Sequence, residues 1–217
     1  MTTNKHQYSE QDRAAIYRAI GERRDMRHFH NDPIDAEIMQ RLFQAAHQAP
    51  SVGYMQPWRI IRITKSELRT EIHNIVDVER IKTAEALAER QQEFMKLKVE
   101  GIKECGELLV MALMDGREQH IFGRRTMPEM DLASVSCAIQ NMWLAARAEG
   151  IGMGWVSMFE PTDLAELLAM PQGAKPIAIL CLGHVKEFYP APMLEIEDWR
   201  KSTHINDVIF TDNWDKE

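Results

Sequence analysis

Apolar residues recur every three or four positions in two stretches near the N-terminus, which predicts two amphipathic helices. The first covers 9–24 with Ser9 as its cap, and the second begins after Asp35 and stops before Pro50. A third stretch, 130–150, is apolar nearly all round and ends in a glycine. It predicts a central helix that is buried on most of its surface.

Shorter apolar runs with the length of strands separate these helices. There are four of them, at 58–64, 107–115, 152–158 and 176–185. The segment 65–103 carries opposite charges at i to i+4 spacing and predicts long helices facing solvent, and 161–170 predicts a short helix. Helices and strands alternate without a regular βαβ succession, so we expect a layered sheet with helices on its faces.

The tail from Lys186 onward is long, polar and poor in core residues, so we expect it to wrap a partner chain. The length of 217 residues predicts a single domain over 1–217. A net charge of −7 argues against binding to nucleic acid or to anionic membranes through a basic face.

Cysteine usage and hydropathy indicate where the protein resides. Three scattered cysteines suggest no disulfide framework and fit a reducing cytoplasm. The N-terminus lacks the apolar segment of a signal peptide, and no run of about 18 apolar residues could span a bilayer. We therefore expect a cytoplasmic protein without a membrane segment.

Three arginines, Arg23, Arg24 and Arg27, fall within five residues at the end of the first predicted helix. Guanidinium groups bind phosphate bidentately, which makes the cluster a candidate phosphate site, and a solvated basic helix end is an equally good interpretation. Asp25 lies among these cations, so we expect its charged form to be favoured. It acts either as a base or as a salt-bridge partner, and the second role is the commoner one.

Two further segments carry polar groups suited to a ligand. The loop 50–57 offers Ser51 and Gln56 to the edge of a flat heterocycle, although Pro-Ser-x-Gly is also an ordinary turn. Ser157 follows a glycine-rich strand start, but the absence of a GxSxG motif argues against a serine hydrolase. No metal-binding spacing, Walker A loop or dinucleotide fingerprint occurs, so we expect no metal centre.

Four segments together resemble the nitroreductase-like FMN proteins: RRDMRHF, APSVGYMQPWRI, MDLASVSCAIQNMWLAARAEGIGMGWVSMF and DWRK. Within that superfamily, RRDxR, GWVS and the aromatic Tyr54 resemble the branch that makes 5,6-dimethylbenzimidazole, the lower ligand of vitamin B12. The resemblance implies an α+β fold with a mixed sheet flanked by helices. It also implies an intertwined homodimer with an exchanged C-terminal extension over 186–217, FMN at the subunit interface and a lid at 77–100.

The same resemblance implies the residues of the site. The expected flavin-binding residues are Arg23, Arg24, Asp25, Met26, Arg27, Pro50, Ser51, Gln56, Trp155, Val156, Ser157 and Arg200. The four arginines would hold the phosphate and ribityl chain, and the residues of the loop 50–57 would come from the partner subunit. Asp25 and Ser157 match the two residues that the synthase branch uses in its chemistry.

The implied reaction is the oxidative fragmentation of reduced FMN by O2 to 5,6-dimethylbenzimidazole and erythrose 4-phosphate. Reduced FMN would be a substrate, supplied by a separate NAD(P)H-dependent flavin reductase. The alternative is an NAD(P)H-dependent reductase that recycles FMN and reduces a nitroaromatic, a quinone, a corrinoid or a halogenated tyrosine. A flavin carrier without turnover is a third possibility.

Overall fold

The computed structural model describes residues 5–214, so the ends of the predicted domain and tail, 1–4 and 215–217, lie outside the described residues. Four strands form one sheet in the order β1-β2-β4-β3. Their bounds are β1 Trp58–Ile63, β2 Glu107–Leu113, β3 Gly152–Val156 and β4 Lys175–Gly183. All four predicted strands are confirmed, with ends shifted by at most two residues.

Every neighbouring pair of these strands is antiparallel. The expectation of a mixed sheet is therefore wrong for the described strands. Parallel pairing is confined to an isolated bridge between Asp25 and Met153, at the free edge of β3. The reason is that the chain before α2 touches β3 at one residue and then turns away, so no fifth strand forms within the described part of the chain.

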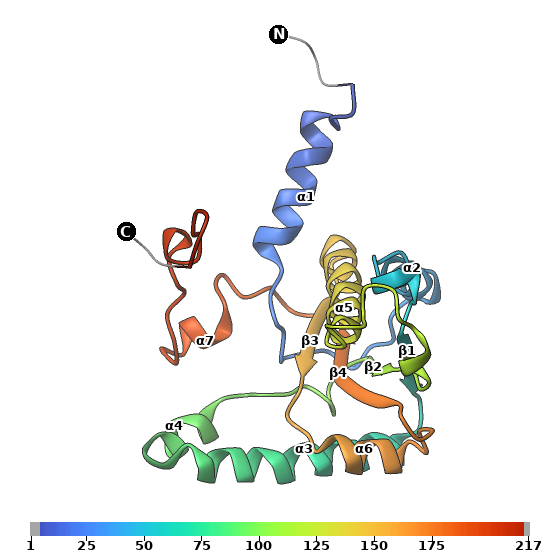
Figure 1. The fold of residues 1–217 in the computed structure, drawn as a ribbon. Helices are drawn as coiled ribbons and strands as arrows, with labels where there is room; N and C mark the ends of the chain where they lie inside the picture. Colours follow the sequence, from blue (N-terminus) through green and yellow to red (C-terminus); the bar gives the residue numbers. More distant parts are fainter. Residues whose placement is uncertain (1–4, 215–217) are drawn as a thin grey trace.

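Two helices cover one face of the sheet, α2 (Ala36–His47) and α5 (Met130–Ala148) (Figure 1). Asp35 caps α2 as predicted, because its Oδ1 accepts hydrogen bonds from the N–H groups of Glu37 and Ile38. Both helices pack their apolar sides on β2 and β4 in one large cluster. The predicted central position of α5 is confirmed, and its end at a glycine is too, since Gly150 has a φ of +74°.

The opposite face is covered by α3 (Ser66–Ala86), α6 (Pro161–Leu167) and the segment 102–105. Side chains alternate along β2, so that Leu109 and Met111 belong to the α5 cluster while Leu108 and Val110 belong to the α3 cluster. This alternation explains the continuous apolar run of β2, which is buried on both faces. Among the described helices, none is both long and apolar enough to cross a bilayer.

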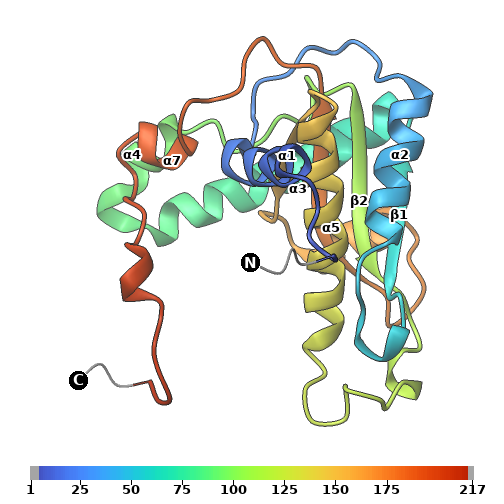
Figure 2. The same cartoon turned by 90° about the horizontal axis from the view of Figure 1, so that it is seen from above.

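Three segments extend from this layered body: α1 (Glu10–Glu22), the far end of α3 with α4 (Gln91–Lys96), and the tail with α7 (Met193–Ile196) (Figures 1 and 2). Short 3-10 turns lie at Val52–Tyr54, Ala88–Arg90, Arg117–Gln119 and Ile205–Asp207. Ser9 caps α1 by accepting a hydrogen bond from the Asp12 N–H at 3.1 Å. The helix ends at Glu22 and Arg23 is extended, so Arg23 and Arg27 do not share a helical face.

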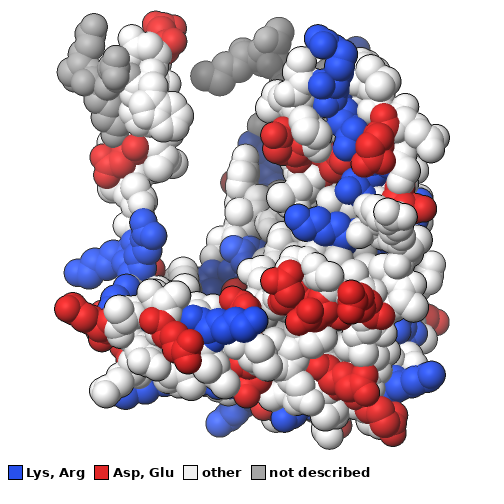
Figure 3. All heavy atoms as spheres, turned by 60° about the horizontal axis from the view of Figure 1, so that its bottom comes forward, with Lys and Arg blue, Asp and Glu red and all other residues white. Residues whose placement is uncertain are grey.

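The tail divides into two parts. Residues 189–199 contact their own protomer through Tyr189, Pro190 and Trp199. Beyond them the side chains of Ile205, Ile209 and Trp214 are more than half exposed. In the space-filling view this end stands apart from the body across a deep recess, and acidic and basic side chains are interspersed over the visible face (Figure 3). The wrapping of a partner by the tail stays a prediction.

Candidate functional site

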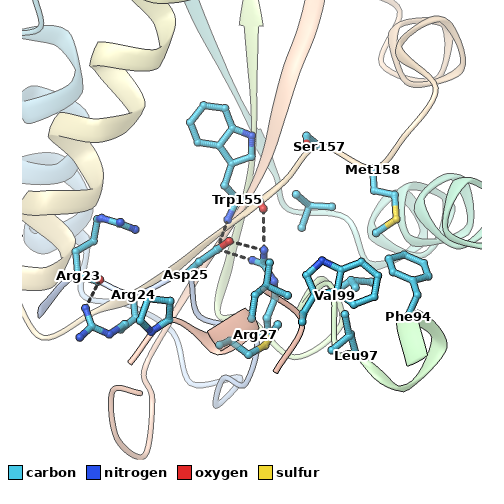
Figure 4. A pocket seen from close by; sticks show the side chains of 15 residues that line it. Arg23, Arg24, Asp25, Arg27, Phe94, Leu97, Val99, Trp155, Ser157 and Met158 are labelled. Carbon is cyan, nitrogen blue, oxygen red and sulfur yellow. Dashed lines mark hydrogen bonds and ion pairs between the residues drawn. The ribbon is translucent and has the colours of Figure 1, made fainter. Parts of the chain in front are cut away.

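A cavity of about 350 Å³ lies where the turn after α1, the end of β3, the α4 region and the tail meet (Figure 4). One wall is polar and one is apolar. The polar wall is formed by the turn after α1 and by the end of β3. It consists of Arg23, Arg24, Asp25, Arg27, Trp155, Val156 and Ser157. The structure thus brings together seven of the twelve predicted site residues, from two segments about 130 positions apart in the chain.

The Asp25 carboxylate and the Arg27 guanidinium form the centre of the polar wall. Nη1 and Nη2 of Arg27 each donate to a different oxygen of Asp25 at 2.6 Å. Oδ1 of Asp25 also accepts the Trp155 N–H at 2.9 Å, and Arg27 Nη2 donates to the Trp155 carbonyl at 3.0 Å. Of the two roles considered for Asp25, the structure shows that of a salt-bridge partner, and the role of a base stays a prediction.

A glycine makes this arrangement possible. The Met26 N–H donates to the Met153 carbonyl at 3.0 Å. This bond places the arginine turn, residues 23–27, directly against β3. A Cβ on Gly154 would clash with the Met26 carbonyl and come within 2.6 Å of Arg27 Nη1. The glycine-rich start of β3 is therefore required for the close approach of the two backbones. Met26 itself is 1% exposed and does not line the cavity, and its role in flavin binding stays a prediction.

Partial burial shifts the pKa of Asp25, whose side chain is 42% exposed. Loss of hydration raises the pKa of Asp25 above its ordinary value, and the Arg27 charge and the Trp155 N–H offset part of this rise. The expectation from sequence counted only the neighbouring cations. The direction of the shift follows from desolvation, the largest effect, and the charged form expected at neutral pH stays a prediction.

Arg23 and Arg24 use their guanidinium groups differently. Arg24 donates to the carbonyls of Gly21 at 2.7 Å, Arg23 at 2.8 Å and Pro190 at 3.1 Å. Arg23 stacks over the Trp143 ring with its Cζ 4.5 Å from the ring centroid. Within the described part of the chain, the Nε atoms of Arg24 and Arg27 are buried without a hydrogen-bond partner. Two donors beside the cavity are thus left for an acceptor on a ligand.

A tyrosine of the tail fastens the arginine turn from outside. Tyr189 Oη accepts the Arg27 N–H at 3.2 Å and lies 2.7 Å from His28 Nδ1. Together with the bond from Arg24 to Pro190, this contact ties the start of the tail to the polar wall. Sequence reasoning missed Tyr189, because its partners lie about 160 positions away in the chain.

The apolar wall was also missed as a set. It consists of Phe94, Leu97, Val99, Met158, Pro192, Met193, Leu194 and Trp199. Three of these side chains belong to the segment predicted as a lid, and the lid role stays a prediction. The available signal was the isolated Phe94 and Leu97 within a charged stretch, together with the tryptophan of DWRK. Apolar residues in such surroundings need an apolar partner elsewhere in the chain.

Comparison with known proteins places this geometry in a family. The family model described as Nitroreductase family matches residues 20–184. The chain belongs to the nitroreductase family. Its resemblance to the dimethylbenzimidazole synthase branch is confirmed by two curated relatives of that name. The relative from Rhodospirillum rubrum is 42% identical over 82% of this chain and 85% of the relative. The relative from Rhodobacter capsulatus is 36% identical over 90% of this chain and 95% of the relative.

The fold of this nitroreductase family member is shared by a solved structure described as oxidized iodotyrosine deiodinase bound to FMN and 3-iodo-L-tyrosine. The TM-score is 0.70 at 20% identity, with 91% of this chain and 98% of that chain covered. This likeness supports the nitroreductase-like α+β architecture predicted from the sequence motifs.

The remaining predicted residues of this nitroreductase family member lie outside the cavity wall of its own protomer. They are Pro50, Ser51, Gln56 and Arg200. Ser51 Oγ accepts the Gln56 N–H at 3.0 Å, so its hydroxyl stabilises the loop itself. Arg200 is exposed and follows Trp199, whose ring does line the cavity. A ligand role for these four residues stays a prediction.

Proposed function

We propose that this protein is a 5,6-dimethylbenzimidazole synthase. The observation that carries the proposal is the 42% and 36% identity to two relatives of that name, over more than four fifths of every chain compared. The reaction is the oxidative fragmentation of reduced FMN by O2, in which 5,6-dimethylbenzimidazole and erythrose 4-phosphate form and the pyrimidine part of the flavin ring leaves as a further fragment. Reduced FMN is the substrate, and a separate NAD(P)H-dependent flavin reductase supplies it.

The residues of the cavity fit FMN in polarity and in size. FMN combines a planar dimethylated ring with a polyhydroxylated chain and a phosphate. A volume of about 350 Å³ falls in the usual range for ligand sites of roughly 300 to 1,000 Å³. The apolar wall suits the ring, and Arg23 and Arg24 suit the phosphate. The partnerless Nε donors of Arg24 and Arg27 suit the acceptors of the chain.

Asp25 is the residue we assign to proton transfer. Its Oδ1 is occupied by Arg27 and by the Trp155 N–H, whereas Oδ2, among the described residues, accepts only from Arg27. Oδ2 therefore keeps a lone pair for a proton of the ribityl chain, whose cleavage requires a base. The raised pKa strengthens Asp25 as a base.

Ser157 is the second residue we assign to the reaction. It is exposed at the end of β3, and its hydroxyl has no hydrogen-bond partner among the residues that the structure describes. The hydroxyl is therefore available to bind a polar atom of the flavin. The apolar wall on the other side of the cavity excludes water, which competes with fragmentation of the flavin.

The active form we propose is a homodimer in which the partner copy contributes Pro50, Ser51 and Gln56 and receives the end of the tail. Two features support it. The loop 50–56 lies outside the cavity of its own protomer, and Ile205, Ile209 and Trp214 are exposed apolar side chains that a second copy would cover.

The test uses the whole protein and reduced FMN. The two are mixed without oxygen, O2 is admitted, and 5,6-dimethylbenzimidazole and erythrose 4-phosphate are measured by mass spectrometry. The expected result is formation of both products with loss of FMN. Intact FMN together with consumption of NAD(P)H would instead indicate the recycling reductase.

The role of Asp25 is tested with Asp25→Asn. We expect product formation to fall at least about 100-fold, as on loss of a general base, while FMN still binds. The matched variant Arg27→Lys keeps the carboxylate and weakens the salt bridge. An equal loss of activity in both variants, or normal activity of Asp25→Asn, would contradict the assignment of Asp25 as the base.

A further inference from the structure

Arg90, at the start of α4, joins the α4 region to the tail. Its Cζ lies 3.5 Å from the centroid of the Trp199 ring, and its Nη2 donates to the Trp199 carbonyl at 3.1 Å. Nε and Nη2 of the same guanidinium donate to the Glu93 carboxylate at 2.9 Å each. One side chain thus contacts both the ring and the backbone of a residue 109 positions away, while Glu93 holds it on α4.

The residue that Arg90 contacts belongs to the apolar wall of the cavity. Trp199 lines it, and its ring lies 6.1 Å from the ring of Phe94, which lines it from α4. Phe94 and Leu97 are buried with Ala84 in a small cluster against Trp199, separate from the two clusters of the sheet. Arg90 does not line the cavity, and its side chain is 45% exposed.

Neither segment has enough internal structure to hold this wall by itself. Helix α4 has six residues and α7 has four, both far shorter than an isolated helix requires. Trp199 is directed by its N–H bond to the Leu194 carbonyl at 2.9 Å and by the preceding Asp198, which has a φ of +52°. Among the described residues, contacts of Arg90 and Phe94 with Trp199 connect the two segments, together with the small cluster around Leu97.

We infer that Arg90 is a positioning residue, which fastens α4 to the tail through Trp199 and so closes the apolar end of the cavity over the flavin. The inference rests on the proposed function for the identity of the ligand. Only a planar guanidinium can stack on the indole, donate to the Trp199 carbonyl and hold Glu93 at the same time. Opening this end would speed loss of the flavin and admit water to the site.

The test measures retention of oxidised FMN, so it does not depend on turnover. Dissociation of FMN from the loaded protein is followed by the recovery of flavin fluorescence, for the wild type, Arg90→Ala, Arg90→Lys and Lys96→Ala. Lys96 is an exposed cation on the same helix that does not line the cavity. We expect Arg90→Ala to release FMN about tenfold faster, and Arg90→Lys to restore only part of the loss. Lys96→Ala should release FMN at the rate of the wild type.

A double-mutant cycle separates positioning from a general loss of structure. In a Trp199→Leu background, Arg90→Ala should have a smaller further effect on release, because the ring it stacks on is absent and the backbone carbonyl contact remains. The free energy of unfolding of the protein without FMN should be nearly unchanged by Arg90→Ala, since the side chain is 45% exposed. Release at the rate of the wild type, or equal effects in both backgrounds, would overturn the inference.

Failure of this inference differs from failure of the proposed function. A wild-type protein that fragments FMN, combined with an Arg90→Ala variant that retains it normally, would refute only the positioning role. A wild-type protein that does not bind FMN would refute the proposed function as well.

Discussion

The layered body and two of its extensions, α1 and the end of the tail, use apolar residues in opposite ways. In the body, Leu42, Ile139 and Leu180 are 0% exposed and lie between the sheet and its helices. In α1, by contrast, no residue is buried in the described structure, and Ile16 and Ile20 are nearly half exposed. The comparison teaches that the body buries its apolar residues within one copy of the chain, whereas α1 and the end of the tail leave theirs exposed.

The cavity lies where the body and the extensions meet. Its polar wall rests on β3, in the body, and its apolar wall is built from α4 and the tail, in the extensions. The polar wall is held by paired backbone and by a bidentate salt bridge, and the apolar wall by a small cluster and by Arg90. We therefore expect the apolar wall to be the more easily opened of the two.

The largest expected effect comes from truncating a core side chain and comparing it with the tail. Ile139→Ala should lower the free energy of unfolding by about 2 to 5 kcal/mol, because it leaves a cavity between α5 and the sheet. Ile205→Ala should lower it by less than about 0.5 kcal/mol in dilute protein, where the tail has no cover.

The measurement is urea denaturation at several protein concentrations. If a second copy covers the tail, the loss of unfolding free energy caused by Ile205→Ala should grow with protein concentration. The loss caused by Ile139→Ala should stay constant. A loss for Ile205→Ala as large as that for Ile139→Ala at every concentration would contradict the distinction between body and extension.

A pair of glycine substitutions has the next largest effect. Gly154→Ala should cost about 1 to 3 kcal/mol of stability and displace the Asp25–Arg27 pair, since the new Cβ meets the Met26 carbonyl. Gly21→Ala, in α1, meets no atom within 4 Å and should stabilise by about 0.5 to 1 kcal/mol through helix propensity. Thermal unfolding and FMN titration of both variants check this, and a neutral Gly154→Ala would show that β3 does not constrain the polar wall.

The smallest effect is the pH dependence contributed by Asp25. Because folding raises the pKa of Asp25, its stabilising contribution is fully present below the ordinary value of 3.8 and is lost as the pH rises through the folded-state pKa. The difference in unfolding free energy between the wild type and Asp25→Asn should therefore fall over this window and stay level above it. Urea denaturation at fixed ionic strength across that range measures it. A difference that increases with pH would show that the Arg27 charge outweighs burial.

Sequence reasoning found the residues whose signals are local. Ser9 and Asp35 cap their helices as predicted, and the continuous apolar run of β2 revealed a strand buried on both faces. The RRDMR and GMGWVS motifs supplied seven residues of the cavity, because family motifs retain the residues around a site. It did not find Tyr189, Trp199 or Arg90, whose roles come from contacts with partners more than 100 positions away.

By itself, the sequence determined the elements of the fold, the family and the polar residues of the site, since periodicity, capping and motifs are written in neighbouring positions. Only the tertiary structure decided that the sheet is antiparallel, that Asp25 pairs with Arg27, and that burial raises the pKa of Asp25. These properties arise only when segments distant in the sequence pack together, because packing decides which groups pair and which lose contact with water.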